Sequence, residues 1–96
     1  MTYCIRVTFP DQSQRPAIIL TGRDAWALQA LVHAGAKGVT PIDTPGPRWS
    51  GYVFNLRRAG LKIETRHEKH GPPFAGTHAR YVLHDTVQIE RMEQAA

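Results

Sequence analysis

The 96-residue sequence has only one cysteine, Cys4, so no internal disulfide can form. A chain without disulfides suits a reducing compartment, and we therefore expect a cytoplasmic protein. No apolar run approaches the ~18 residues that a membrane-spanning helix needs, so no membrane partner is expected. The first nine residues alternate polar and apolar side chains and lack the continuous apolar block of a signal peptide.

Motifs of common enzymes are also missing. The sequence has no glycine-rich phosphate loop, no HExxH and no glycine-flanked serine of the GxSxG kind. Asp43 and Glu64 are single carboxylates without an evident partner for acid–base catalysis. We expect a non-enzymatic protein with no catalytic residues and no cofactor.

Histidines are the one candidate for metal binding. His67 and His70 lie close together in "HEKH", and His78 would lie across a hairpin from His67. A structural zinc site usually has four ligands, however, and the only cysteine is far away in sequence. Solvated histidines are the favoured interpretation, and no metal site is predicted.

What the chain does have is a globular composition and an uneven charge. With 42% hydrophobic and 21% charged residues it predicts a single folded domain. Residues 48–80 carry seven Lys or Arg and only two Glu, a net charge of +5, whereas the rest carries −1. A polyanionic partner is the simplest interpretation of a basic surface confined to one third of a chain, and a solvated basic surface stays open as the alternative.

The first part of the chain predicts a hairpin and then a helix. Residues 3–9 alternate as a strand, a polar turn follows, and "AIIL" is a candidate second strand, which makes residues 1–20 an N-terminal extension. Cys4 is expected on the polar face of this edge strand, and the edge could pair with a second copy in a homodimer. Apolar residues at helical spacing predict a helix over Gly22–Ala34, with Thr21 as N-cap and Gly35 as its end.

The second part predicts a further helix pair and a hairpin. Val39 and Thr40 could form a very short strand. Thr40 and Pro41 could also be the N-cap and first-turn residues of a brief helix. An amphipathic helix is expected over residues 47–59, ending at Gly60, and a hairpin with a basic tip over residues 62–83. Residues 85–96 are expected to form a polar tail, frayed or briefly helical.

The segment "LRRAGLKIETR" passes from helix through glycine directly into a strand, and "HARYVL" returns after a Gly/Pro-rich tip. In these features the chain resembles the winged helix-turn-helix family from about residue 21 to residue 83. "VTPIDTPGPRWSGYVFNLRRAG" is similar to small bacterial and phage-associated winged-helix proteins in particular. The resemblance implies an α+β fold with a three-helix core and a β-hairpin wing, and a DNA-binding regulator or phage-type accessory protein.

Such a protein would place helix 47–59 in the major groove of double-stranded DNA and the wing on the backbone. Arg48 is suited to a guanine, Ser50 and Asn55 to bases or phosphates, and the other basic residues to phosphates. Gly51 indicates either tight packing or close contact with a partner. The predicted DNA-binding residues are Arg48, Ser50, Gly51, Asn55, Arg57, Arg58, Lys62, Arg66, Lys69, His70 and Arg80.

Two alternatives stay open. Phe54 lies off the apolar stripe, so it either packs under the wing or is exposed at a protein interface, which would make the domain a protein–protein interaction module. The same basic surface could instead bind RNA, with Tyr52, Phe54 or Phe74 stacking on bases.

Overall fold

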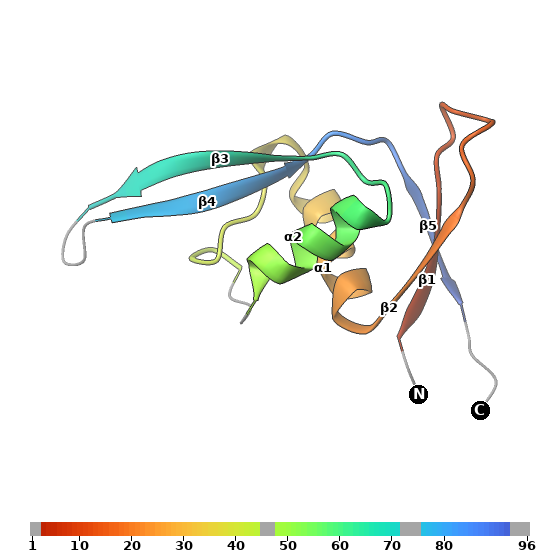
Figure 1. The fold of residues 1–96 in the computed structure, drawn as a ribbon, viewed down its shortest axis with the longest axis horizontal. Coiled ribbons are helices and arrows are strands. Elements are labelled where there is room, and N and C mark those ends of the chain that lie inside the picture. The colour runs from red at the N-terminus through yellow and green to blue at the C-terminus, as the bar shows by residue number, and fades with distance from the viewer. Residues whose placement is uncertain (1–2, 45–47, 72–75, 93–96) are drawn as a thin grey trace.

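A computed structural model describes residues 3–44, 48–71 and 76–92 of the chain. The elements are β1 (Cys4–Thr8), β2 (Ile18–Thr21), α1 (Gly22–Ala34), a 3₁₀ turn (Gly35–Lys37), α2 (Trp49–Arg58), β3 (Ile63–His70), β4 (Gly76–Leu83) and β5 (Gln88–Met92). Two α-helices lie between a three-stranded sheet and a long two-stranded hairpin that projects from the body (Figure 1). No helix within these residues is long and apolar enough to cross a membrane.

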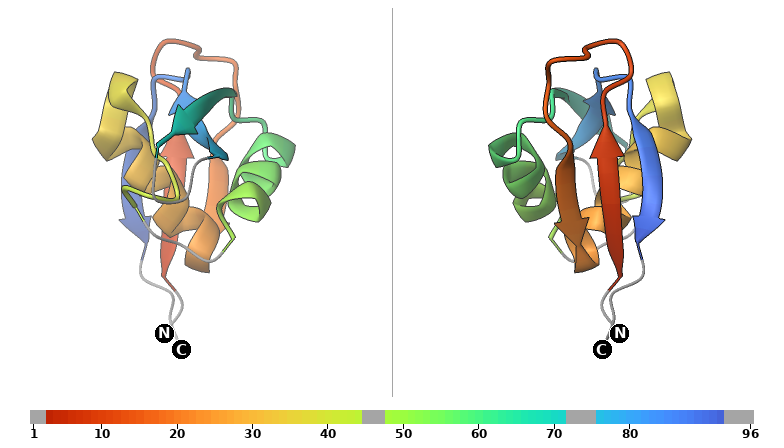
Figure 2. Two further views of the ribbon diagram at one scale, coloured as in Figure 1. Left: turned by 90° about the vertical axis from the view of Figure 1, so that its left-hand side faces the viewer. Right: turned by 90° about the vertical axis from the view of Figure 1, so that its right-hand side faces the viewer.

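The three-stranded sheet has the order β2-β1-β5, and both pairs are antiparallel. Ile5 and Val7 alternate along β1 toward the helices and are fully buried. Both helices lie on this side of the sheet, as Figure 2 shows. The predicted N-terminal hairpin is therefore confirmed as β1 and β2.

The end of the chain differs from the prediction. Residues 88–92 form β5, which pairs with β1 from Cys4↔Met92 to Thr8↔Gln88, so the expected frayed or helical tail is wrong. Ile89 is the only strongly apolar residue between Gln88 and Arg91, so the alternation is too weak to show in the sequence. With β5 in place β1 is the central strand, so its edge is not open to a second copy, and Cys4 is buried at 2% exposure.

The two helices have nearly the predicted bounds. Helix α1 spans the predicted residues, and Gly35 follows it with a positive φ of 59°. Helix α2 buries the predicted stripe of Trp49, Tyr52, Val53 and Leu56.

The expected three-helix core is wrong for the described residues, which contain two α-helices and one 3₁₀ turn. Between them, Thr40 forms only a turn: its hydroxyl accepts a hydrogen bond from Asp43 N–H, and its carbonyl accepts one from Thr44 N–H. Pro41 follows Thr40 directly, and Pro45 and Pro47, which lie outside the described residues, remove backbone donors that a longer helix needs.

The predicted hairpin is confirmed as β3 and β4, whose register runs from Ile63↔Leu83 to His70↔Gly76. Gly60, at φ 110°, turns the chain from α2 toward β3. Val39 forms an isolated bridge with Tyr81, which confirms the very short strand. Gly38 before it is required, because a Cβ there would lie 2.6 Å from the Tyr81 carbonyl oxygen.

Aromatic residues join the helices to the hairpin. Trp49 of α2 lies 5.4 Å from Trp26 of α1 and 5.9 Å from Tyr52, measured between ring centroids. It also stacks on Tyr81 of β4 at 6.3 Å, and its indole N–H donates to the Thr44 carbonyl. This cluster fixes the direction of α2 relative to the hairpin.

Candidate nucleic-acid interface

Helix α2 presents a polar and basic outer face to solvent. Arg48 is its N-cap residue, and the side chains of Arg48, Ser50, Asn55 and Arg58 are exposed. The helix has no acidic residue of its own, and two arginines occupy its last turn. The predicted α2 residues are therefore brought together on one accessible surface.

Phe54 lies at the centre of that outer face and is 60% exposed. This excludes the alternative in which Phe54 packs under the hairpin. The guanidinium of Arg58 lies 5.7 Å from the centre of its ring. An apolar ring among basic groups suits contact with a thymine methyl group or with a protein partner.

Gly51 has open space on the same face. Among the described residues, a Cβ built there would have only Arg48 nearby, at 3.8 Å, which is an ordinary van der Waals distance. Internal packing therefore does not require glycine, although glycine costs a helix up to about 1 kcal/mol relative to alanine. Tight packing against the described residues therefore does not explain Gly51.

Arg57 connects α2 to the hairpin. Its guanidinium donates to the Ile63 carbonyl at 2.7 Å and to the Thr65 hydroxyl at 2.8 Å. No acidic group among the described residues neutralises it, so its charge still contributes to this side of the molecule. Arg57 thus has a structural contact as well as a place in the predicted basic surface.

The hairpin has two different faces. Side chains alternate along a strand, so Thr65, His67 and Lys69 share the face to which Arg57 bonds, and Tyr81 across the register packs on α2. His67 and Lys69 are exposed there. We call this side, facing α2, the near face of the hairpin.

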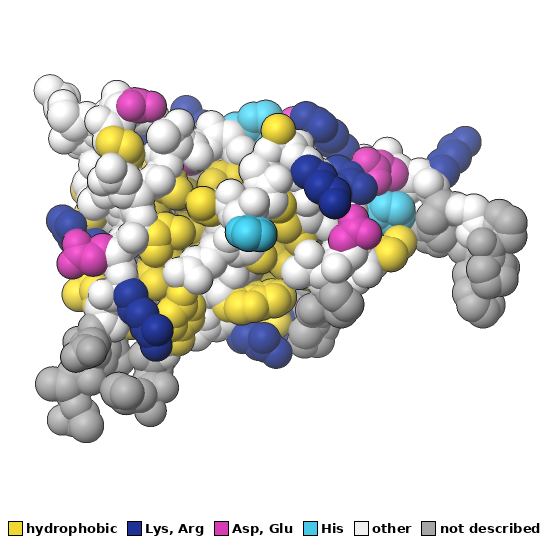
Figure 3. Space-filling model, turned by 180° about the vertical axis from the view of Figure 1, so that it is seen from behind, with side chains coloured by type: hydrophobic (Ala, Val, Ile, Leu, Met, Phe, Trp, Pro, Cys, Tyr) yellow, Lys and Arg dark blue, Asp and Glu magenta, His cyan; other side chains and the backbone are white. Residues whose placement is uncertain are grey.

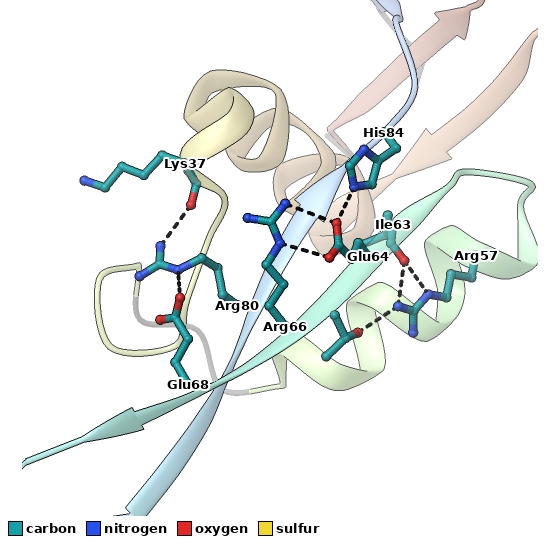
Figure 4. Close-up of polar contacts among 9 residues, drawn as sticks. Lys37, Arg57, Ile63, Glu64, Arg66, Glu68, Arg80 and His84 are labelled. Carbon is teal, nitrogen blue, oxygen red and sulfur yellow. Dashed lines mark hydrogen bonds and ion pairs between the residues drawn. The ribbon is translucent and has the colours of Figure 1, made fainter.

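The far face carries ion pairs instead, as Figure 4 shows. Arg66 donates to Glu64 at 2.9 Å, and Nε2 of His84 lies 2.6 Å from the same carboxylate. Arg80 donates to Glu68 at 2.7 Å and to the Lys37 carbonyl at 3.0 Å. Two of the predicted phosphate contacts, Arg66 and Arg80, are therefore already neutralised within the chain.

These ion pairs lower the pKa values of the two glutamate carboxyl groups. Hydrogen bonds from Arg66 and then His84 lower the pKa of Glu64 to about 2, and the hydrogen bond from Arg80 lowers the pKa of Glu68. Glu64 and Glu68 are therefore ionised at neutral pH, and they reduce the positive charge of the far face. The basic surface predicted for residues 48–80 is concentrated on α2 and on the near face.

Lys62 lies beside a partly buried ion pair. Arg15 binds the Asp85 carboxylate through both terminal nitrogens, at 2.8 and 3.1 Å, and the Lys62 N–H donates to it at 2.8 Å. Burial raises the pKa of Asp85, but the hydrogen bonds from Arg15 and Lys62 outweigh burial and leave it lowered. The Lys62 side chain itself is exposed.

The face opposite to that of Figure 1 has a different mix of side chains from the outer face of α2. Hydrophobic side chains gather over its middle, and acidic side chains lie beside several basic ones (Figure 3). The α2 side is therefore the better candidate for a polyanion.

A family model described as a winged helix domain matches residues 17–93. The chain belongs to the winged helix-turn-helix family. No curated protein and no solved structure matches the chain.

In this winged helix, α2 corresponds to the helix expected at residues 47–59, and β3 and β4 form the wing. The matched residues also include β5, whereas the resemblance seen in the sequence ended at about residue 83. Two of the expected features at the wing tip cannot be placed, because Phe74 and the side chain of His70 lie outside what the structure describes.

The two wing histidines whose side chains are described, His67 and His78, are not brought together. His67 is paired with Ala79 in the register and His78 with Glu68, so the two imidazoles lie on opposite faces. Nε2 of His78 lies 3.1 Å from the Glu68 carboxylate. In the described part of the chain no three His, Cys, Asp or Glu side chains could hold a metal ion.

One basic residue near α2, Arg23, was not among the residues predicted from the sequence. Arg23, at the start of α1, lines a groove of about 410 Å³ together with Asp24 and residues of α2. Asn55 donates to Asp24 across this groove at 3.3 Å. Arg23 lies outside the basic segment 48–80, and only the packing of α1 on α2 brings it there.

Proposed function

We propose that this winged helix binds double-stranded DNA, with α2 in the major groove and the near face of the wing along the backbone. The observation that carries the proposal is the outer face of α2, which is basic, has no acidic residue of its own and has space at Gly51 among the described residues, with Asp24 of α1 as an acidic neighbour. A helix with these properties suits the width and charge of the major groove.

The proposed contacts follow from the placement of each side chain. Arg48, Ser50 and Asn55 are suited to base edges, and Arg57, Arg58, Lys62 and Lys69 to phosphates. Arg66 and Arg80 are assigned to holding the wing, because Glu64 and Glu68 already occupy their guanidinium groups. A regulator of transcription or a phage-type accessory protein would use such a domain, and we propose it as non-enzymatic.

Arg48 tests the proposed base reading. After selection of a preferred duplex, Arg48→Ala is expected to weaken binding to that duplex by about 1–3 kcal/mol and to affect random duplexes less. Fluorescence anisotropy on both duplexes measures this difference. Equal losses on the two would contradict the assignment of Arg48 to bases.

A protein-interaction module is the second candidate, favoured by the exposure of Phe54 and of Ile42, which is 57% exposed before α2. Exposed apolar side chains of this size are typical of protein interfaces. If the domain is a protein-interaction module, we expect weak, sequence-independent DNA binding, and Arg48→Ala should change that affinity little. The anisotropy measurement thus separates the two functions.

A further inference from the structure

The groove between α1 and α2 is open and lies directly beside the proposed reading face. Gly51 and Tyr52 of α2 line it, with Phe54 and Asn55 further along the helix. Thr21, Arg23 and Asp24 line it from the start of α1, and Arg48 completes the lining. Its volume of about 410 Å³ leaves room for a sugar-phosphate unit.

The charge of the groove favours an anion. Arg23 and Arg48 are both exposed, and neither forms an ion pair within the described residues. The Arg23 guanidinium lies 5.3 Å from the Trp26 ring, a contact that places the group without neutralising it. Among the described residues of the lining, Asp24 is the one acidic residue, and Asn55 donates to it.

The beginning of α1 adds to this field. Thr21 is the N-cap residue but makes no side-chain hydrogen bond to the helix, so its hydroxyl does not satisfy the first backbone N–H groups. The positive end of the α1 dipole therefore lies at the groove alongside two guanidinium groups.

We propose that this groove binds one phosphodiester of the DNA backbone, with Arg23 as its main contact. The proposal rests on the proposed DNA binding and extends the interface from α2 to α1. The guanidinium group of Arg23 can form paired hydrogen bonds to phosphate oxygens. A lysine would offer only a point charge, so an arginine suits this contact better. Gly51 in the lining lets the sugar-phosphate chain approach the α2 backbone.

The test compares two variants, each of which replaces one arginine by glutamine and so removes the same positive charge. Arg23→Gln removes the proposed contact, and Arg6→Gln is the control, since Arg6 is exposed on the central strand β1 of the sheet. Binding of a random duplex is measured by anisotropy at several salt concentrations. Arg23→Gln is expected to weaken binding roughly fivefold and to flatten the slope of log K against log salt by about 0.9, the loss of one phosphate contact. Arg6→Gln is expected to keep the slope of the unmodified protein.

Asp24→Asn gives an effect of opposite sign. Removal of the carboxylate repulsion is expected to strengthen DNA binding roughly twofold, which a general loss of structure cannot do. Equal slopes for Arg23→Gln and Arg6→Gln, or weaker binding by Asp24→Asn, would overturn the groove assignment while DNA binding itself stands. Absence of duplex binding by the unmodified protein would instead overturn the proposed function.

Discussion

Single residues on α2 have two different roles, and the internal contacts separate them. Arg57 bonds to Ile63 and Thr65, whereas Ser50, Gly51 and Phe54 face outward. The sequence predicts the buried stripe of α2 because apolar residues recur at helical spacing. It could not predict that Arg66 and Arg80 meet Glu64 and Glu68, because such contacts depend on side-chain conformations and on the register of the hairpin.

Gly51→Ala separates stability from binding. We expect the free energy of unfolding to rise by about 0.5–1 kcal/mol, since alanine favours a helix and the added methyl group has space. Affinity for duplex DNA is expected to fall, because the methyl group enters the surface that a partner approaches. Thermal unfolding and anisotropy on the same variant measure the two effects. A more stable variant with unchanged affinity would show that no partner approaches Gly51.

At the scale of elements, the sequence predicts α1, α2 and the wing, because each has strong periodicity, and Gly35 and Gly60 mark the ends of the two helices. It does not predict β5, whose only strongly apolar residue before its last position is Ile89. A third helix was expected from Thr40 and Pro41, but in the described residues Thr40 makes a single turn. The Thr40–Pro41 capping pattern and the family resemblance both favoured this helix, whereas the prolines that follow favour a turn.

The two faces of the wing are expected to respond differently to substitution. Lys69→Ala on the near face should weaken DNA binding uniformly across sequences and flatten the salt slope by about 0.9. Arg66→Ala removes the same charge from the far face, three residues from Lys69 along β3, and it also releases Glu64. It is the control for the face of the wing. Anisotropy at several salt concentrations compares them.

A flattened salt slope in Arg66→Ala, with no change in Lys69→Ala, would show that DNA contacts the far face. That result would reverse the proposed orientation of the wing.

On the scale of the whole molecule, acidic groups connect parts that are distant in sequence. Asp85 joins the loop before β2 to the end of the wing through Arg15, and Glu68 joins β3 to β4 through Arg80. Neither connection could be predicted from spacing. Arg15 and Asp85 are 70 positions apart, and Glu68 and Arg80 meet only because of the register of the hairpin.

These carboxyl groups predict a loss of stability in acid. The pKa of Glu64 is lowered to about 2, and the pKa values of Glu68 and Asp85 are also lowered in the folded protein. Groups with a lowered folded pKa stabilise the fold above their unfolded pKa, near 4, and that stabilisation is lost as the pH falls toward the folded pKa. Thermal unfolding midpoints are therefore expected to fall steadily from about pH 4.5 to pH 2.

Asp85→Asn provides the control for this pH dependence. The variant is expected to be less stable at pH 7 and to show a smaller further loss in acid, because one of the three titrating groups is gone. An unmodified protein with the same unfolding midpoint at pH 5 and pH 2.5 would contradict the account of these ion pairs.

The central claim is that the α2 side of this winged helix binds double-stranded DNA through its phosphates and bases. Its most direct test is an anisotropy titration of short random duplex DNA with the unmodified protein at two or three salt concentrations. We predict binding at low salt that weakens steeply as salt increases, because each phosphate contact releases counterions. No binding at low salt would contradict the claim and favour the protein-interaction module.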